Sequence, residues 1–168
     1  MYVTEALMDY VEAFSQWGFL MAFLYCLASS INKENKSSVY LSALMLCSYF
    51  SSGYINLLES LYLNWALYDF ITILALLTLQ YFKVLQRSAA FHFIIFALII
   101  NAVLTLILHY DLYVLYNYEP WWYWSVYSIG INTIDVLMML SLILNKNFLS
   151  LIKLSPLITI KSTRSPNA

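Results

Sequence analysis

The chain is poor in charged residues. Lys, Arg, Asp and Glu make up only 10% of its 168 residues, whereas 62% of the residues are hydrophobic. Soluble domains carry charged side chains at about 25% of their positions, because their surfaces face water. A chain with so few charges cannot cover a globular core with a solvated surface. Its composition therefore predicts that lipid surrounds most of the folded protein.

Other residue types that occur in small numbers exclude further classes of function. Eight Lys and Arg against nine Asp and Glu give a net charge of −1, and a nucleic-acid partner requires clustered basic residues that neutralise phosphates. Glycine and proline occur only three times each. The broken helices of many transporters use such residues to unwind near the midplane. Long unbroken helices and no nucleic-acid partner are therefore expected.

No pattern in the sequence predicts a cofactor, a metal site or a catalytic residue. Cys26 and Cys47 lie in apolar stretches and match no zinc, haem or redox spacing. His109 and Asp111 lie close together in the sequence, but without a metal-ligand spacing such as HExxH. Ser52 lies in SSGY, which is not the GxSxG nucleophile motif. We therefore expect a protein that is not an enzyme.

Five stretches are long and apolar enough to cross a bilayer, which takes about 20 residues for a hydrocarbon core about 30 Å thick. Residues 13–32, 37–58 and 88–110 contain no charge, and residues 65–82 and 123–145 contain one acid each, Asp69 and Asp135. We place Asp69 about one turn inside the outer boundary, where it can reach the headgroups. The prediction is an all-α transmembrane bundle of five spans over residues 1–145, followed by a basic tail at 146–168.

The basic residues determine the predicted orientation, because Lys and Arg gather in cytoplasmic loops. They follow the first, third and fifth spans, at Lys33, Lys36, Lys83, Arg87, Lys146, Lys153, Lys161 and Arg164. The opposite side contains acids only, at Glu5, Asp9, Glu12, Glu59, Asp111 and Glu119. We therefore expect the amino terminus outside and the tail in the cytoplasm, in a bacterial inner membrane or a plasma membrane. Because the start MYVTEALMDY has no basic region, we expect no cleaved signal peptide.

Polar residues form a stripe within these apolar spans. In the fifth span, Ser128, Asn132 and Asp135 recur at steps of four and three, which places them on one helix face. Asn101 and Thr105 share a face of the fourth span, and Asn101 is the expected partner of Asp135 near the midplane. The stripe is interpreted either as interhelical hydrogen-bond glue or as the lining of a route for an ion, proton or solute. Glue is favoured, because so small a bundle has little room for a cavity of its own.

Aromatic residues gather at the predicted outer end. All five Trp fall in the outer part of their spans or just beyond, and residues 110–124 read YDLYVLYNYEPWWYW. Such rings anchor helices at headgroup level, and Tyr and Trp also provide rigid docking surfaces at low entropic cost. The residues of this outer aromatic surface are Tyr113, Tyr116, Tyr118, Trp121 and Trp122. Its expected contacts are lipid headgroups or a protein partner.

Two functions fit these features. The favoured one is a non-enzymatic membrane subunit that scaffolds, senses or recruits a partner through its bundle and the outer aromatic surface. The expected partners are the lipid bilayer and either another membrane protein or further copies of this chain. The alternative is a small channel or transporter subunit, in which an oligomer encloses a conducting stripe centred on Asp135.

Overall fold

The computed structural model describes residues 5–32, 34–119 and 121–144, and this part of the chain folds into five α-helices. The helices are α1 (Glu5–Ser29), α2 (Ser37–Tyr54), α3 (Leu61–Tyr81), α4 (Ala89–Tyr113) and α5 (Trp122–Leu144). The predicted all-helical architecture is confirmed for these residues. The predicted basic tail, residues 146–168, lies outside them.

The helices differ in how well they match a membrane span. Among the described residues, α3, α4 and α5 are long and apolar enough to cross a bilayer. The apolar part of α1 is shorter, Ala13–Ser29, and α2 has 18 residues, six of them serine. Length and composition therefore support three spans directly, in a chain whose described part forms five helices.

The helix boundaries differ from the predicted spans mainly around the turn between α2 and α3. Helix α2 ends at Tyr54, earlier than predicted, because Ile55 has an extended backbone. The fully buried side chain of Asn64 accepts a hydrogen bond from the backbone N–H of Leu57 at 2.8 Å. This contact holds the turn against the first residues of α3, which starts at Leu61, four positions before the predicted span.

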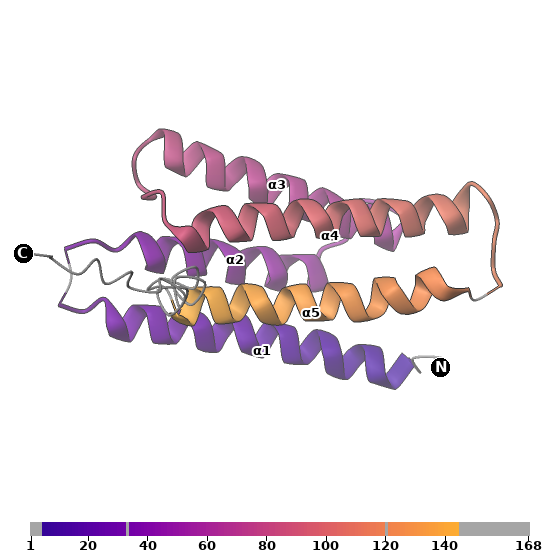
Figure 1. The fold of residues 1–168 in the computed structure, drawn as a ribbon, viewed down its shortest axis with the longest axis horizontal. Coiled ribbons are helices and arrows are strands. Elements are labelled where there is room, and N and C mark those ends of the chain that lie inside the picture. Colours follow the sequence, from indigo (N-terminus) through magenta and orange to yellow (C-terminus); the bar gives the residue numbers. More distant parts are fainter. Residues whose placement is uncertain (1–4, 33, 120, 145–168) are drawn as a thin grey trace, which may run out of the picture.

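The helices form a closed ring. Each helix packs against the next one in the sequence, and α5 returns to pack against α1 (Figure 1). Because successive helices run in opposite directions, α1 and α5 lie parallel. Gly18 of α1 faces Met139 of α5 so closely that a Cβ atom at position 18 would overlap the Met139 sulfur. Glycine at this position therefore allows the two helices that close the ring to approach each other.

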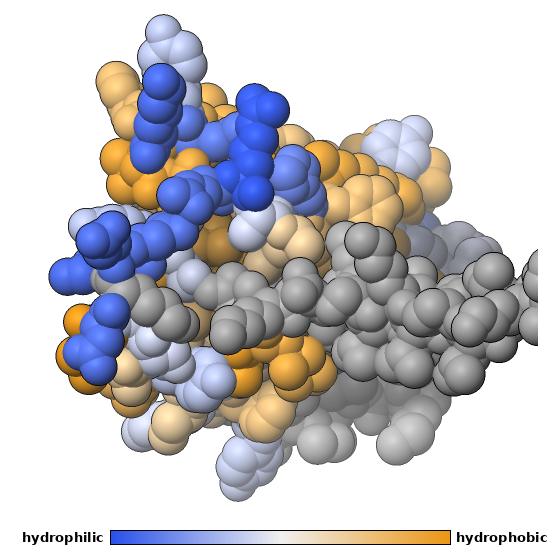
Figure 2. Space-filling view, turned by 60° about the vertical axis from the view of Figure 1, so that its left-hand side comes forward, coloured by the Kyte–Doolittle hydropathy of each residue, from blue (hydrophilic) through white to orange (hydrophobic). Residues whose placement is uncertain are grey.

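One end of the ring carries the basic residues that the structure describes. Lys36 lies in the connection between α1 and α2, and Lys83 and Arg87 lie in the connection between α3 and α4. The two connections are joined by a hydrogen bond of 2.7 Å from the amide of Asn35 to the side chain of Gln86. Figure 2 shows hydrophilic residues gathered at this end beside a largely apolar surface. We call it the basic end.

Along the helix axes, the half of the bundle next to the basic end is filled mainly by apolar side chains. Two buried hydroxyls also lie there, those of Ser42 and Ser141, and each donates a hydrogen bond to a carbonyl of its own helix. Each helix contributes at least one fully buried residue to a single apolar cluster there, and these residues include Phe19, Met45, Leu76, Leu98 and Met138. We call this cluster the apolar plug. The other half of the ring is filled differently, and it contains the candidate site.

Candidate functional site

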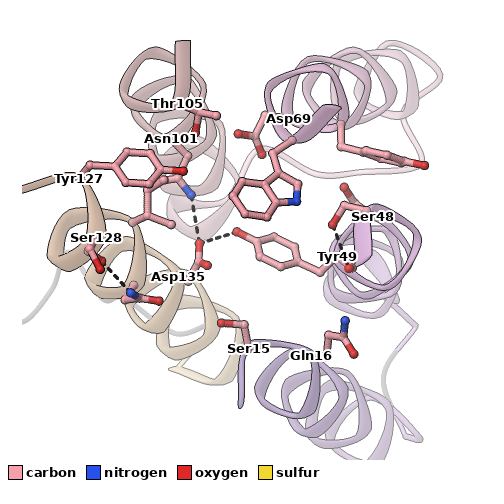
Figure 3. Close-up of a pocket in the computed structure, with 15 residues that line it drawn as sticks. Ser15, Gln16, Ser48, Tyr49, Asp69, Asn101, Thr105, Tyr127, Ser128 and Asp135 are labelled. Atoms are coloured by element: carbon pink, nitrogen blue, oxygen red, sulfur yellow. Dashed lines mark hydrogen bonds between the residues drawn. The ribbon is translucent and has the colours of Figure 1, made fainter. Parts of the chain in front are cut away.

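A cavity of about 200 Å³ lies between the five helices, on the side of the apolar plug that faces away from the basic end. Every helix contributes to its lining, from Ser15 in α1 to Asp135 in α5 (Figure 3). On each helix the lining residues lie in the half away from the basic end, or at the middle. The cavity is therefore a half-depth pocket whose inner side meets the apolar plug.

Asp135 lies at the inner side of this pocket and is 5% exposed. Its Oδ1 atom accepts a hydrogen bond of 3.0 Å from the side-chain amide of Asn101 and another from the hydroxyl of Tyr49. The ring of Tyr49 packs against Phe19 with 4.1 Å between centroids, so the hydroxyl is held in place from the plug side. Three helices, α2, α4 and α5, thus meet at one carboxylate.

The contact between Asn101 and Asp135 is the one expected from their depths in the sequence. Tyr49 was not expected, because an aromatic residue in an apolar span reads as packing. The spacing contains a signal for it: Ser48 and Ser52 are four positions apart, which places them on one face of α2, and Tyr49 lies between them in the sequence. All three residues line the pocket.

The Oδ1 atom of Asn101 is a buried hydrogen-bond acceptor that has no partner among the described residues. Asn101 is 4% exposed and lines the pocket. A buried amide oxygen without a donor costs about 1 to 3 kcal/mol. A bound donor in the pocket would remove this cost.

Asp69 lies farther from the start of its helix than the predicted span implied. It was expected about one turn inside the outer boundary, with its carboxylate reaching the headgroups. Because α3 begins at Leu61, Asp69 lies eight residues into the helix, about 12 Å at 1.5 Å per residue. Its side chain points into the pocket, as Asp135 does (Figure 3). The pocket therefore contains two carboxyl groups.

The remaining stripe residues also line the pocket. Thr105 is buried one turn from Asn101 on α4, and Ser128 and Asn132 lie on α5 farther from the basic end than Asp135. The amide of Asn132 donates a hydrogen bond of 2.6 Å to the backbone carbonyl of Ser128 within its own helix. The structure thus brings all five predicted stripe residues to one cavity, inside a single copy of the chain.

The outer aromatic surface lies at the opposite end from the basic residues. Tyr113, Tyr116, Tyr118 and Trp122 are exposed there. Trp121 is 39% exposed and donates its indole N–H to Asp111 at 2.8 Å. These five residues gather around the connection from α4 to α5.

Asp111 has a role that the sequence did not indicate. It is buried, and its carboxylate accepts hydrogen bonds from the indoles of Trp121 and Trp124 and from the amide of Asn117 at 2.8 to 3.2 Å. The His109 side chain instead contacts Ser60, with 3.1 Å between Nδ1 and the serine hydroxyl. Within the described residues, no three His, Cys, Asp or Glu side chains converge as a metal site would require. Asp111 instead clamps the connection from α4 to α5.

Comparison of the chain with protein-family models, with curated proteins and with solved structures found no match. Function is therefore inferred from the geometry of the pocket and of the two ends of the ring.

Proposed function

We propose that this protein is a five-span integral membrane protein that binds a small polar solute in its pocket from the outer side, without catalysing a reaction. The observation that carries the proposal is the Asp135 carboxylate, held by Asn101 and Tyr49 at the inner side of a cavity lined by all five helices. Polar groups inside a membrane are costly and are usually retained for function. Here they surround a space that a solute can fill.

Binding is favoured over conduction because the polar lining is confined to one half of the ring. A conducting path needs polar or hydrated surface along its whole length. The apolar plug occupies the other half, where fully buried side chains from every helix fill the centre. The arrangement therefore fits a sensor or receptor for a solute better than a channel.

The orientation in the proposal has the amino terminus outside and the basic tail in the cytoplasm. It is supported by the position of Lys36, Lys83 and Arg87 at one end of the ring, because basic residues stay on the cytoplasmic side. Helices α1 and α2 are less apolar than the others. Part of their surface lines the pocket instead of facing lipid, which makes them compatible with spans. A bacterial inner membrane or a plasma membrane suits this orientation.

Reporter fusions to both ends of the chain test the orientation, and thiol labelling tests the pocket. In a chain with Cys26→Ala and Cys47→Ala, Ser52→Cys introduces a thiol into the pocket lining. A membrane-impermeant thiol reagent added outside intact cells is expected to label it. Ser42→Cys is the matched control on the same helix, because Ser42 is fully buried in the half towards the basic end. Labelling of position 52 only from the cytoplasmic side, or equal labelling of both positions, would contradict the proposal.

A second candidate function is the recruitment of a membrane partner, or of further copies of this chain, through the outer aromatic surface. The exposure of Tyr116 and Tyr118, 69% and 68%, favours it. Large exposed aromatic side chains beside a clamped connection form a preorganised docking surface. The two functions are compatible, because α4 and α5 both line the pocket and lead into this surface.

A further inference from the structure

The pocket is lined by acidic side chains and by no basic side chain. Asp69 and Asp135 both line it, and no Lys, Arg or His is among its lining residues. Two carboxyl groups that share a poorly solvated space cannot both ionise cheaply unless a positive charge lies between them. A cationic ligand would supply that charge, whereas an anion would add to the repulsion.

The unused hydrogen-bonding groups of the pocket are acceptors, so they favour a ligand that donates hydrogen bonds. The Oδ1 atom of Asn101 is an acceptor without a donor among the described residues. Asp135 receives both of its hydrogen bonds on Oδ1, and no hydrogen bond to Asp69 is present in the described part of the chain. The unused acceptors therefore belong to three side chains that face one space (Figure 3). An ammonium group, with several N–H donors and a positive charge, matches them.

The walls of the pocket distinguish an organic cation from a metal ion. Trp65, Tyr68 and Tyr127 line the cavity together with the polar groups, and aromatic rings attract ammonium groups through their negative faces. The volume of about 200 Å³ equals roughly seven water molecules at about 30 Å³ each. A bare metal ion would leave most of this space unfilled, whereas a compact amine would fill it.

We infer that the pocket binds a small organic cation, consisting of an ammonium group on a compact apolar body. The inference rests on the proposed function, since it names the class of solute that this pocket takes. The ammonium group lies between Asp69 and Asp135, one N–H reaches Asn101, and the apolar body lies against the aromatic walls.

Binding of probe amines to the full chain in lipid nanodiscs tests the inference. The probes are n-butylammonium and benzylammonium, each paired with the neutral alcohol of the same skeleton, 1-butanol and benzyl alcohol. Trp65 lies in the pocket wall, so tryptophan fluorescence reports occupancy, with empty nanodiscs as the baseline. At least one amine is expected to bind saturably, with a Kd at least ten-fold lower than that of its alcohol.

Asp69→Asn is the decisive variant. It removes an ionisable carboxyl group from the pocket, and no hydrogen bond to Asp69 in the described part of the chain is lost with it. It is expected to weaken amine binding at least ten-fold while the Tm of the unliganded protein stays close to that of the original. Glu59→Gln is the matched control, because Glu59 is exposed and lies outside the pocket lining. It is expected to leave the Kd unchanged.

Two results would overturn the inference: no amine binding more tightly than its alcohol, or an unchanged Kd in Asp69→Asn. Either result leaves the proposed function standing if Ser52→Cys is still labelled from outside. Conversely, absence of that labelling would remove the proposed access from the outer side, even if the purified protein binds amines. Thiol labelling therefore tests the proposed function, and amine binding tests the inference, independently of each other.

Discussion

The side chains of Asn101 and Asp135 are joined by a hydrogen bond of 3.0 Å inside the ring, although 34 positions separate them in the sequence. The bond links α4 to α5 at the point where the pocket meets the apolar plug. The bond uses only the NH₂ group of the Asn101 side chain, and the side-chain oxygen has no donor among the described residues. The same pair thus stabilises the fold and leaves an acceptor for a ligand.

Substitution of Asp135 by Asn and by Leu separates its hydrogen-bonding role from its charge. Asn retains an acceptor for Tyr49 and Asn101 and gains an N–H, so it is expected to reduce the free energy of unfolding by less than about 1 kcal/mol. Leu leaves both neighbouring polar groups without their partner and is expected to cost about 1 to 3 kcal/mol. Unfolding in mixed detergent micelles measures both values.

The affinity for amines is expected to change in a different way from the free energy of unfolding in these two variants. Because either change removes one of the two carboxyl groups of the pocket, Asn and Leu are both expected to weaken amine binding at least ten-fold. A Leu variant as stable and as active in binding as the original would show that Asp135 has neither role.

The periodicity of the sequence predicted which residues share a helix face, and this accounts for much of the site. Steps of three and four grouped Ser128, Asn132 and Asp135, and depth counting paired Asp135 with Asn101. Both features are local or depend only on distance along a helix axis. For the same reason, the described helices overlap each of the predicted spans.

The remaining features depend on contacts that local periodicity does not specify. Tyr49 reaches Asp135 across 86 positions, which requires a particular rotation of α2 within the ring. The depth of Asp69 depends on where α3 begins, and that start is fixed by the contact between Asn64 and Leu57 in a turn. The ring closure that creates the pocket is a relation between the first and last helices, so a single chain was wrongly expected to have little room for a cavity.

Closure of the ring at Gly18 is open to a direct test. Gly18→Ala places a methyl group against the side chain of Met139, and overpacking of this kind costs about 1 to 3 kcal/mol. Gly130→Ala is the matched control on α5, because its Cβ would lie 3.5 Å from Leu104, an ordinary contact. It is expected to be neutral. Stability is measured by unfolding in mixed micelles.

The Met139 contact also predicts a rescue. Met139→Ala removes the atoms that a methyl group at position 18 would meet, so the double variant is expected to lose less stability than the sum of the two single variants. Strict additivity of the two losses would show that the α1 and α5 backbones do not approach as closely as described.

Loss of the Asp111 clamp is expected to loosen the end of the ring that lies opposite the basic end. Asp111→Ala removes the acceptor of two indole N–H groups and one amide, and hydrogen bonds to a charged group contribute about 1.5 to 3 kcal/mol each when buried. Since part of this cluster faces outward, we expect a total loss of about 2 to 3 kcal/mol and a red shift of tryptophan emission. Glu119→Ala, an exposed acid in the same connection, is expected to change neither. An unaltered emission spectrum in Asp111→Ala would contradict the clamp.

The outer aromatic surface can be separated from simple membrane anchoring by replacing several of its exposed rings together. Tyr113, Tyr116 and Tyr118 are all at least half exposed, so Ser at these three positions removes contact area without opening the core. Recovery of a crosslinked partner or of a higher oligomer is expected to fall at least about ten-fold, which corresponds to about 1.4 kcal/mol. The amount of inserted protein should stay the same, because Trp121 and Trp122 still mark the interface.

The matched control replaces Tyr25, Tyr40 and Tyr81, which are similarly exposed but lie towards the basic end. This triple variant removes the same number of rings, so any general effect of lost aromatic surface on insertion or solubility appears in both variants. Only the outer triple is expected to reduce recovery of the complex. If both variants recover it equally well, the outer rings act as an aromatic belt and the second candidate function loses its support. If both lose it equally, the effect lies in lipid anchoring at either interface, because no partner of one end would depend on rings at the other.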